Sequence, residues 1–317
     1  MPTVTLLGPQ AHEPNLREAL QLAHRQGPFV SISAGWQERE GEIEELRSHV
    51  GAAVQDLGIY ALTDDIFSAD RALRVAHRDR QAQLQEMQEL YSLQLSHAMA
   101  AAHELFARQG GAAASLRAAR RQAIALLRRL DRAHLRAIQR LHAEFERTVQ
   151  PRSRSGVRHA TDLVRQQIAS ANTVFIAGGH VPILVNRLRL LGGAALFADR
   201  PVVAWSAGAM VLAEVIVLYH DHPPQGAANA EVFEAGLGMV RGIVPLPHAQ
   251  TRLALHDSRR VALMARRFSP AACLTLDAGA CLHCDSNGLR YHSGSFQLSR
   301  TGSLSEIATR SRAPELL

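Results

Sequence analysis

The sequence predicts a three-layer α/β fold, in which a mostly parallel sheet carries helices on both faces and is interrupted by a long helical hairpin. Short apolar runs alternate with helix-forming segments in residues 1–62 and again in residues 156–317, which is the pattern of β-α-β units. Residues 63–155 differ, because from about residue 68 to residue 150 they contain almost no Gly or Pro outside Gly110 and Gly111. The chain has 317 residues, of which 47% are hydrophobic, and can therefore bury a normal core.

The first 62 residues are expected to form the first part of the α/β domain. Apolar runs at 3–7 and 29–33 are predicted to be strands, with a helix at about 13–25 between them. Residues 38–57 are predicted to be largely helical, with an acidic first half. The opening segment lacks a basic region followed by an apolar stretch, so we expect a core strand there and not a signal peptide.

Residues 63–155 are expected to form an insertion made of two long antiparallel helices and a linker. Apolar side chains recur at steps of three and four residues at Leu84, Met87, Tyr91, Ala98, Ala102 and Leu105, and again at Leu127, Leu130, Ala137, Leu141 and Phe145. Helices of about forty residues span roughly 60 Å, so we expect the hairpin to protrude from the α/β domain. Its predicted roles are to join a homo-oligomer through residues 68–150 or to cover the active site as a lid.

The second helix of this hairpin carries a run of arginines with few acids among them. They are Arg117, Arg120, Arg121, Arg128, Arg129, Arg132, Arg136 and Arg140. A solvated helical face is the favoured interpretation, as for most charge runs. Nucleic-acid binding is the less favoured alternative, because no aromatic side chains accompany the arginines to stack on bases.

After a linker at 151–156, the alternating pattern resumes. Helices are predicted at 158–170, 181–191, 207–218 and 257–268, and strands at 173–177, 202–205 and 242–246. Residues 273–298 are predicted to form short antiparallel strands with a turn at 286–288, and residues 300–317 a loose tail. Strands that alternate with helices favour a mostly parallel sheet.

The stretch PVVAWSAGAMVLAEVIV at 201–217 carries the main functional signal. A predicted buried strand ends at Ser206, and an apolar helix starts directly after it. A serine on such a tight turn projects its hydroxyl away from the sheet, and the start of the helix offers unpaired N–H groups to a developing anion. This is the pattern of a nucleophile elbow, although Ala204 stands where G-x-S-x-G has glycine. The alternative is a close-packed strand–helix junction without chemistry.

Two further strands are expected to end near this serine. The strand at 173–177 runs into Gly178 and Gly179, a turn whose backbone N–H groups can face a ligand, and the strand at 242–246 leads to His248. Ligands of open α/β sheets bind beyond the carboxyl ends of the strands. A nucleophile, a base and an oxyanion hole at one rim are the groups that acyl transfer needs.

Read in order, Ile-Ala-Gly-Gly at 176–179, Trp-Ser-Ala-Gly-Ala at 205–209 and Pro-His at 247–248 resemble the serine peptidase family of aspartyl dipeptidase (dipeptidase E) and cyanophycinase. The resemblance covers roughly residues 156–290, and the first sixty residues resemble the family more weakly. It implies a fold similar to that of the class I glutamine amidotransferases. Those amidotransferases have cysteine at the elbow, so the serine here favours a hydrolase.

The resemblance also implies roles for individual residues. Carried over by position, Ser206 is the nucleophile, His248 is the general base, and Gly179 with the N–H of Ala207 forms the oxyanion hole. The third member of the family's triad is a carboxylate on a later strand, for which Asp277 is favoured and Asp221 is the alternative.

Three further residues are candidates for substrate binding. They are Gly178 in the glycine turn, His180, where the family usually has asparagine, and Arg252. His180 is expected either to line the pocket or to cap a helix. Arg252 is a candidate because family similarity suggests a peptide with an acidic residue, which would need an arginine in the pocket.

These observations predict a serine hydrolase that cleaves an amide bond in a small peptide or peptide-like metabolite by a Ser-His-Asp mechanism, without a cofactor or a metal. The alternative is a catalytically inactive relative that acts as a protein-interaction module through its helical arm. The departures from the family pattern at Ala204 and His180 leave this alternative open.

Composition excludes some other classes of protein. The formal net charge is +6, and every basic residue other than histidine is arginine, so a P-loop or a lysine Schiff base is excluded. Cys281 and Cys284 flank His283 in a C-x-x-C pattern, which is a weak zinc signal; buried strand cysteines are the default interpretation. The apolar stretch at 201–219 is interrupted by Ser206 and Glu214, so no membrane segment is expected, and the cytoplasm is the predicted location.

Overall fold

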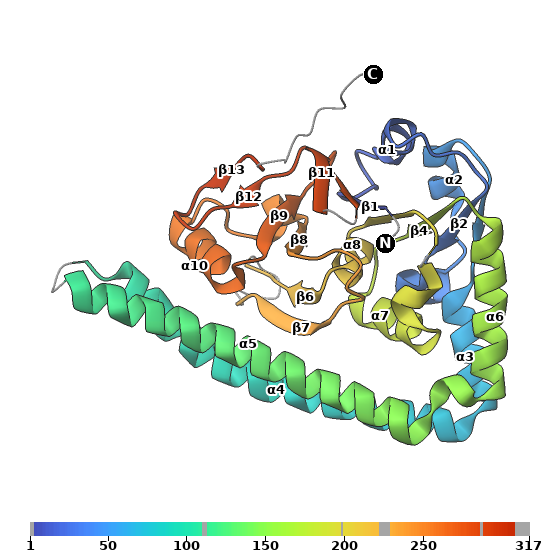
Figure 1. Cartoon of the computed structure of the whole chain (residues 1–317), viewed down its shortest axis with the longest axis horizontal. Helices are drawn as coiled ribbons and strands as arrows, with labels where there is room; N and C mark the ends of the chain where they lie inside the picture. The colour runs from blue at the N-terminus through green and yellow to red at the C-terminus, as the bar shows by residue number, and fades with distance from the viewer. Residues whose placement is uncertain (1–2, 110–112, 198, 222–228, 286–287, 308–317) are drawn as a thin grey trace.

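The computed structural model describes residues 3–109, 113–197, 199–221, 229–285 and 288–307 of the chain (Figure 1). Its main sheet has seven strands in the order β11-β10-β1-β5-β4-β2-β3. The parallel strands are β1 (Val4–Leu7), β2 (Phe29–Ile32), β3 (Val54–Asp56), β4 (Thr173–Ile176) and β5 (Val202–Trp205). At one edge, β10 (Cys281–Asp285) and β11 (Gly288–Ser293) run antiparallel. The predicted α/β class with a mostly parallel sheet is confirmed.

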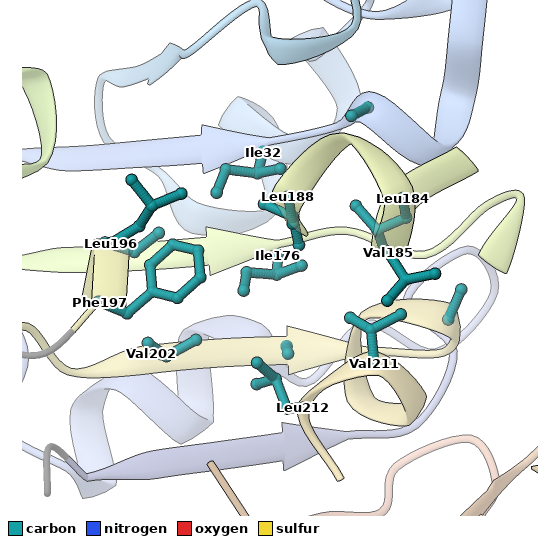
Figure 2. Close-up of a cluster of buried hydrophobic side chains, with 14 of the residues drawn as sticks. Ile32, Ile176, Leu184, Val185, Leu188, Leu196, Phe197, Val202, Val211 and Leu212 are labelled. Atoms are coloured by element: carbon teal, nitrogen blue, oxygen red, sulfur yellow. The ribbon is translucent and has the colours of Figure 1, made fainter. Parts of the chain in front are cut away.

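Helices cover both faces of this sheet because successive strand residues point to opposite sides. Phe175 and Ala177 belong to a cluster with helices α1 (Leu16–Leu22) and α2 (Glu44–Val50). Val174 and Ile176 belong to the opposite cluster, with α3 (Ile59–Ala69), α6 (Ser155–Ser170) and α7 (Val181–Leu190). Figure 2 shows the centre of this second cluster, where β-branched and leucine side chains of strands and helices interdigitate.

A second sheet lies beside the first. Its four strands have the order β13-β12-β9-β8, and the remaining hairpin pairs β6 with β7. The elements of this part are β6 (Val215–Leu218), β7 (Glu231–Ala235), β8 (Ile243–Pro247), α9 (Ala249–Arg252), α10 (Ser258–Phe268), β9 (Ala272–Leu276), β12 (Gln297–Leu298) and β13 (Leu304–Ser305). The strand that precedes His248 therefore belongs to a different sheet from β4 and β5, although the apolar sequence of β8 does not distinguish it from them.

Two stretches predicted as helix contain strands. Within 38–57, only η1 (Ala34–Arg39) and α2 are helical, and β3 closes the edge of the main sheet. The predicted helix at 207–218 ends early, as α8 (Ala207–Leu212), and the β-branched run Val215–Leu218 becomes β6. The pairing partner of β6 is β7, which the sequence did not indicate. β-branched side chains favour strand over helix, so Val215–Val217 follow their local propensity, and the helix predicted from the continuous apolar run is wrong here. The remaining short 3-10 helices are η2 (Pro151–Ser153) and η3 (Gly193–Phe197). The turn predicted at 286–288 lies largely outside the described residues.

The cysteines are strand residues. Cys281 packs in the cluster on one face of the main sheet and Cys284 in the cluster on the other, so the C-x-x-C pair does not converge. Within the described ranges, no cluster of three or more His, Cys, Asp or Glu side chains is arranged to hold a metal ion. In the same part of the chain, no helix combines the length and the apolar character needed to cross a membrane.

The helical hairpin consists of α4 (Arg71–Ala107) and α5 (Ala113–Val149), each 37 residues long. The helical hairpin packs along the β6–β7 hairpin and α10 for much of its length, and its far end extends past α10 (Figure 1). The expected protrusion therefore applies to the far end only. Tyr91, Leu95 and Met99 of α4 are buried with Val232 of β7 and Leu263 of α10. None of the residues that line the candidate active-site cleft described below comes from α4 or α5, so the hairpin does not cover it in this structure.

Buried polar groups join the helical hairpin to α10 and β7. The Arg267 guanidinium of α10 donates from Nε and Nη2 to the two carboxylate oxygens of Asp131, at 2.7 and 2.6 Å. It also donates to the Tyr91 hydroxyl and to the Ala230 carbonyl. The Tyr91 hydroxyl in turn donates to Asp131 and accepts from the Val232 N–H. Each polar group in this buried cluster therefore has a partner, as a low-dielectric interior requires.

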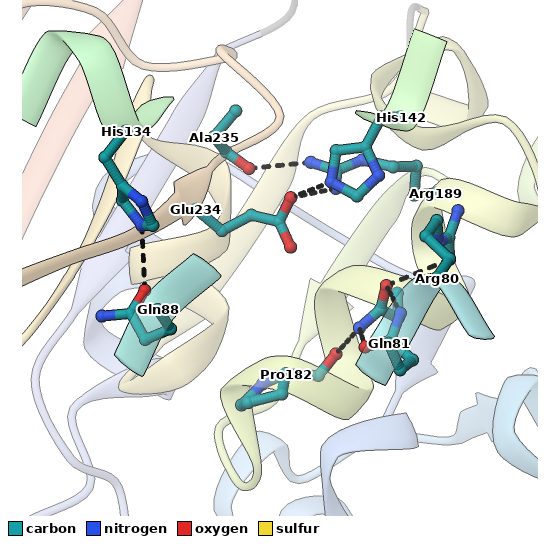
Figure 3. A network of polar contacts seen from close by, with 10 residues as sticks. Arg80, Gln81, Gln88, His134, His142, Pro182, Arg189, Glu234 and Ala235 are labelled. Atoms are coloured by element: carbon teal, nitrogen blue, oxygen red, sulfur yellow. Dashed lines mark hydrogen bonds and ion pairs between the residues drawn. The ribbon is translucent and has the colours of Figure 1, made fainter. Parts of the chain in front are cut away.

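A second polar cluster lies nearer the main sheet (Figure 3). The buried Glu234 carboxylate of β7 pairs with Arg189 of α7 and bonds to His142 of α5. The Arg189 guanidinium also donates to the Ala235 carbonyl at 2.8 Å. Burial lowers the pKa of His142, although its bond to Glu234 opposes this shift. The cluster ties α5, α7 and β7 together through charge-assisted hydrogen bonds.

Breaking the buried ion pair between Arg267 and Asp131 tests how the hairpin is held. Arg267→Met should lower the free energy of unfolding by about 3–5 kcal/mol, because it leaves the Asp131 carboxylate buried and unpaired. The double variant Arg267→Met/Asp131→Leu should recover most of this loss, since it removes both charges. Urea denaturation followed by circular dichroism measures both effects.

Arg259→Met is the matched control for this experiment, because Arg259 lies on the same helix and is exposed. It should change the free energy of unfolding by no more than about 0.5 kcal/mol. Equal losses in Arg267→Met and in this control would contradict a structural role for the buried pair.

Candidate active site

Ser206 lies on the tight turn between β5 and α8 with a left-handed backbone, φ 51° and ψ −120°. Such a conformation is costly for a residue with a side chain, and it persists where the surrounding packing enforces it. Here the packing is backbone against backbone. A Cβ on Gly208 would lie 2.2 Å from the Ile176 carbonyl oxygen, and one on Gly178 would lie 2.8 Å from the Ser206 Cβ. The small residues of the motif are therefore needed to bring α8 against β4.

His248 meets this serine from the second sheet. It follows β8 and also has a left-handed backbone, φ 57° and ψ 35°, with its N–H donating to the Leu276 carbonyl of β9 at 3.1 Å. Its Nε2 lies 3.3 Å from the Ser206 Oγ, within hydrogen-bonding distance. The two residues are 42 positions apart in the chain and are joined only by the tertiary structure.

The environment of His248 favours the neutral imidazole. The ring is half-buried, and burial lowers its pKa, with the nearby Arg252 guanidinium lowering it further. A neutral imidazole can accept the serine proton, which an imidazolium cannot do. The geometry and the protonation state both suit a general base.

The structure brings neither candidate carboxylate to this histidine. Asp277 accepts a hydrogen bond from the Gln250 N–H at 2.8 Å and so caps α9, and burial raises its pKa. Asp221 accepts from the Ala254 N–H at 3.0 Å and pairs with Arg260. Among the described residues, no carboxylate bonds to the His248 ring. The predicted triad is thus, in this structure, a Ser206–His248 pair.

The glycine turn lies beside the serine, as the sequence analysis expected. Gly179 has φ 107°, a conformation that glycine adopts without strain, and a Cβ there would lie 2.3 Å from the Gly35 carbonyl oxygen. Neither the Gly178 nor the Gly179 N–H donates to a backbone carbonyl of the described chain. Ala207 is the first residue of α8, where an N–H has no partner within its own helix. These groups are available to an anion beside the Ser206 hydroxyl.

A cleft of about 370 Å³ contains these groups. It is lined by Pro9, Gln10, Ala11, Trp36, Glu45, Leu46, His49, Gly178, Gly179, Val181, Trp205, Ser206, Ala207, Met210, Pro247, His248 and Arg252. Arg252 and the glycine turn were predicted from the sequence to lie here, whereas Trp36, Glu45 and His49 were not. Because β2 ends at the same rim, the residues that follow it could have been suspected, whereas α2 carries no such signal.

His180 does not line this cleft. Its side chain is exposed, and Nδ1 accepts from the Ile183 N–H at 3.3 Å, which caps the start of α7. Of the two expectations for His180, the structure therefore matches the helix cap. The proposed substrate contact at this position finds no support in the geometry.

The pH dependence of the reaction of Ser206 tests the environment of His248. Labelling by a fluorophosphonate should rise with pH through the His248 pKa, which lies below the usual 6.5, because only the neutral ring accepts the proton. Arg252→Gln removes a cation that disfavours the imidazolium, so it should raise this pKa and move the rise to higher pH. Labelling rates between about pH 4 and 8 measure this shift.

Arg241→Gln is the control for this measurement, because Arg241 is exposed and does not line the cleft. Its profile should match that of the unaltered protein. A profile that stays in place in Arg252→Gln, or that moves to lower pH, would show that Arg252 does not act on the imidazole.

Two substitutions of Asp277 distinguish its role as a helix cap from a role as the third member of the triad. Asn keeps the side-chain oxygen that accepts from Gln250, so Asp277→Asn should label at a rate within about threefold of the original. Asp277→Ala removes the cap and should cost about 1 kcal/mol in the free energy of unfolding. A loss of more than about 100-fold in Asp277→Asn would instead place the carboxylate on the histidine during the reaction.

Comparisons with known proteins find similar solved structures but no matching protein family or curated sequence. The fold is similar to that of a peptidase from an acI-B1 Actinobacterium, with 12% identity, a TM-score of 0.46, and coverage of 98% of this chain and 96% of that one. It is also similar to the "Putative Peptidase E Protein" of Listeria monocytogenes EGD-e, with 14% identity, a TM-score of 0.30, and coverage of 41% of this chain and 63% of that one. Both of these solved structures are named as peptidases, and both are distant from this chain in sequence.

Proposed function

We propose that the protein is a serine hydrolase of the dipeptidase E and cyanophycinase type, which cleaves an amide bond in a small peptide or peptide-like metabolite. The observation that carries this proposal is the distance of 3.3 Å between the Ser206 Oγ and the His248 Nε2. A second observation supports it. Of five non-glycine residues with positive φ in the described chain, two are Ser206 and His248. Backbone strain of this kind gathers at functional sites.

The proposed reaction starts with transfer of the Ser206 proton to the neutral His248 ring. The serine oxygen attacks the amide carbonyl, and the N–H groups of Gly179 and Ala207 stabilise the oxyanion. His248 then gives its proton to the leaving amine, and an acyl–serine ester remains. Water, deprotonated by the same imidazole, releases the acid and restores the serine.

The cleft favours a small substrate with a carboxylate. A volume of about 370 Å³ is at the lower end of the range for small-molecule sites, which suits a dipeptide better than a folded protein. Arg252 is exposed, lies in the cleft and has no ion pair in the described residues. Its guanidinium is proposed to bind a carboxylate of the substrate through paired N–H donors.

Ser206→Ala tests the proposal. The unaltered protein should react with a fluorophosphonate and hydrolyse members of a dipeptide panel, with acidic residues preferred. Ser206→Ala should lose labelling completely and lose at least about 10³-fold in kcat, because no other group can form the acyl-enzyme. Ser153→Ala, which removes an exposed hydroxyl, should behave as the unaltered protein.

The outcome against the proposal is equally defined. Unaltered, folded protein that neither labels nor cleaves any peptide would favour the catalytically inactive alternative. Retention of a partner protein that depends on residues 68–150 and not on Ser206 would then support an interaction role for the hairpin.

A further inference from the structure

A groove rich in arginine lies between the outer part of the helical hairpin and the end of α10. Its lining, here called the arginine groove, consists of Phe106, Arg117, Arg120, Arg121, Ile124, Ala125, Arg128, Arg266 and Arg300. Its volume is about 600 Å³, and it shares no residue with the cleft around Ser206. Six of the nine lining residues are arginines and none is acidic. Four of these arginines belong to the charge run of α5, and the fold adds Arg266 and Arg300 from distant segments.

Three of the arginines are held in place by neutral groups. Arg120 donates to the carbonyls of Leu105 and Arg108 at the end of α4, at 3.0 and 2.9 Å. Arg128 donates to the carbonyls of Arg266 and Arg267 at the end of α10. Arg300 donates to the Ser269 hydroxyl. Carbonyl and hydroxyl partners fix a guanidinium without neutralising it, so the positive charge of the groove remains.

The remaining arginines of the groove have N–H groups without a hydrogen-bond partner in the described part of the chain. Arg117 and Arg121 are exposed, lie four residues apart on one face of α5, and have no hydrogen bond or ion pair within the described part of the chain. The Arg266 Nε is buried and has no partner there. The pKa of Arg128 is lowered by burial and by the nearby cations Arg300 and Arg132. Uncompensated repulsion among these cations is relieved when an anion binds between them.

The chemistry of the lining indicates which anion suits it. Guanidinium groups bind phosphate through paired N–H donors, and several of them at one site match a ligand with adjacent phosphates. Phe106, the one aromatic side chain of the lining, already lies against the Arg120 and Arg266 guanidinium groups, with 5.4 and 5.7 Å to the ring centroid. Its stacking with these cations leaves it poorly placed to stack on a base. The groove is therefore suited to recognise charge and not a nucleobase.

We propose that the arginine groove binds a small ligand with adjacent phosphate groups, of the diphosphate or triphosphate class. Such a ligand would bridge α5, α10 and the segment after β12. It would thus add contacts between the outer hairpin and the second sheet. This binding is separate from the hydrolase activity proposed for Ser206, and neither proposal depends on the other.

Isothermal titration calorimetry with the full chain tests this proposal at about 150 mM salt, where exposed charges are well screened. The probes are inorganic tripolyphosphate, ATP and a single-stranded DNA oligonucleotide. Tripolyphosphate should bind saturably at one site. ATP should bind with equal or lower affinity, because the phosphates alone are recognised and Phe106 is already occupied by the Arg120 and Arg266 guanidinium groups. A clearly higher affinity for ATP would contradict recognition by charge alone.

Two double variants with the same change in charge provide the comparison. Arg117→Gln/Arg121→Gln removes two groove donors that make no contact needed for folding, and it should weaken tripolyphosphate binding by at least about tenfold. Arg136→Gln/Arg140→Gln removes two exposed arginines of the same helix outside the groove, and it should leave the affinity within about twofold. Thermal unfolding confirms that both variants remain folded.

Three results would overturn the proposal. The first is no saturable binding of tripolyphosphate up to about 1 mM, which is weaker than a specific site of this charge should give. The second is equal weakening by both double variants, which would indicate only unspecific attraction to a basic surface. The third is an oligonucleotide affinity at least about tenfold above that of tripolyphosphate, which would make the groove part of a nucleic-acid surface.

Discussion

The close approach of α8 to β4 is the contact on which the rest of the structure depends. All six residues of α8 are buried, and Gly208 lies so near the Ile176 carbonyl that no side chain fits between them. The carbonyls of Val211 and Leu212 accept from the N–H groups of Leu237 and Val240, so α8 also anchors the chain that leads to β8. One short helix thus fixes the turn of Ser206 and joins the two sheets whose edges form the cleft.

The candidate site joins two turns, one from each sheet. Ser206 and His248 both have positive φ, Ser206 where β5 turns into α8 and His248 where β8 turns into α9. His248 has a lowered pKa and no carboxylate partner among the described residues, so its proton affinity is set by burial and by Arg252. Such a ring is a competent acceptor near neutral pH, but an imidazolium formed on it has no bonded carboxylate in the described part of the chain to stabilise it.

The hairpin shows how polar residues can make a buried interface. The inward face of α5 carries Ile124, Leu127, Asp131, His134, Ile138, His142 and Phe145, at steps of three and four residues. The recurrence of apolar residues predicts that Leu127 and Phe145 are buried. It predicts that the polar residues Asp131, His134 and His142 face the solvent. These side chains are buried because Arg267, Gln88 and Glu234 bond to them. Buried polar groups that need specific partners allow few alternative dockings, which accounts for a hairpin that packs along β7 and α10 over much of its length.

The sequence by itself determined the α/β class, the parallel strands β1, β2, β4 and β5, the two long helices, and the Ser206 turn, because each is encoded by local periodicity or by a short pattern of small residues. The tertiary structure decided that β8 belongs to a second sheet and that β6 replaces the last part of a predicted helix. It also decided that His248 reaches Ser206 while Asp277 does not reach His248. Where the hairpin docks is likewise decided by the tertiary structure. These features depend on pairings between residues tens to hundreds of positions apart, and the local sequence pattern does not identify the distant partner.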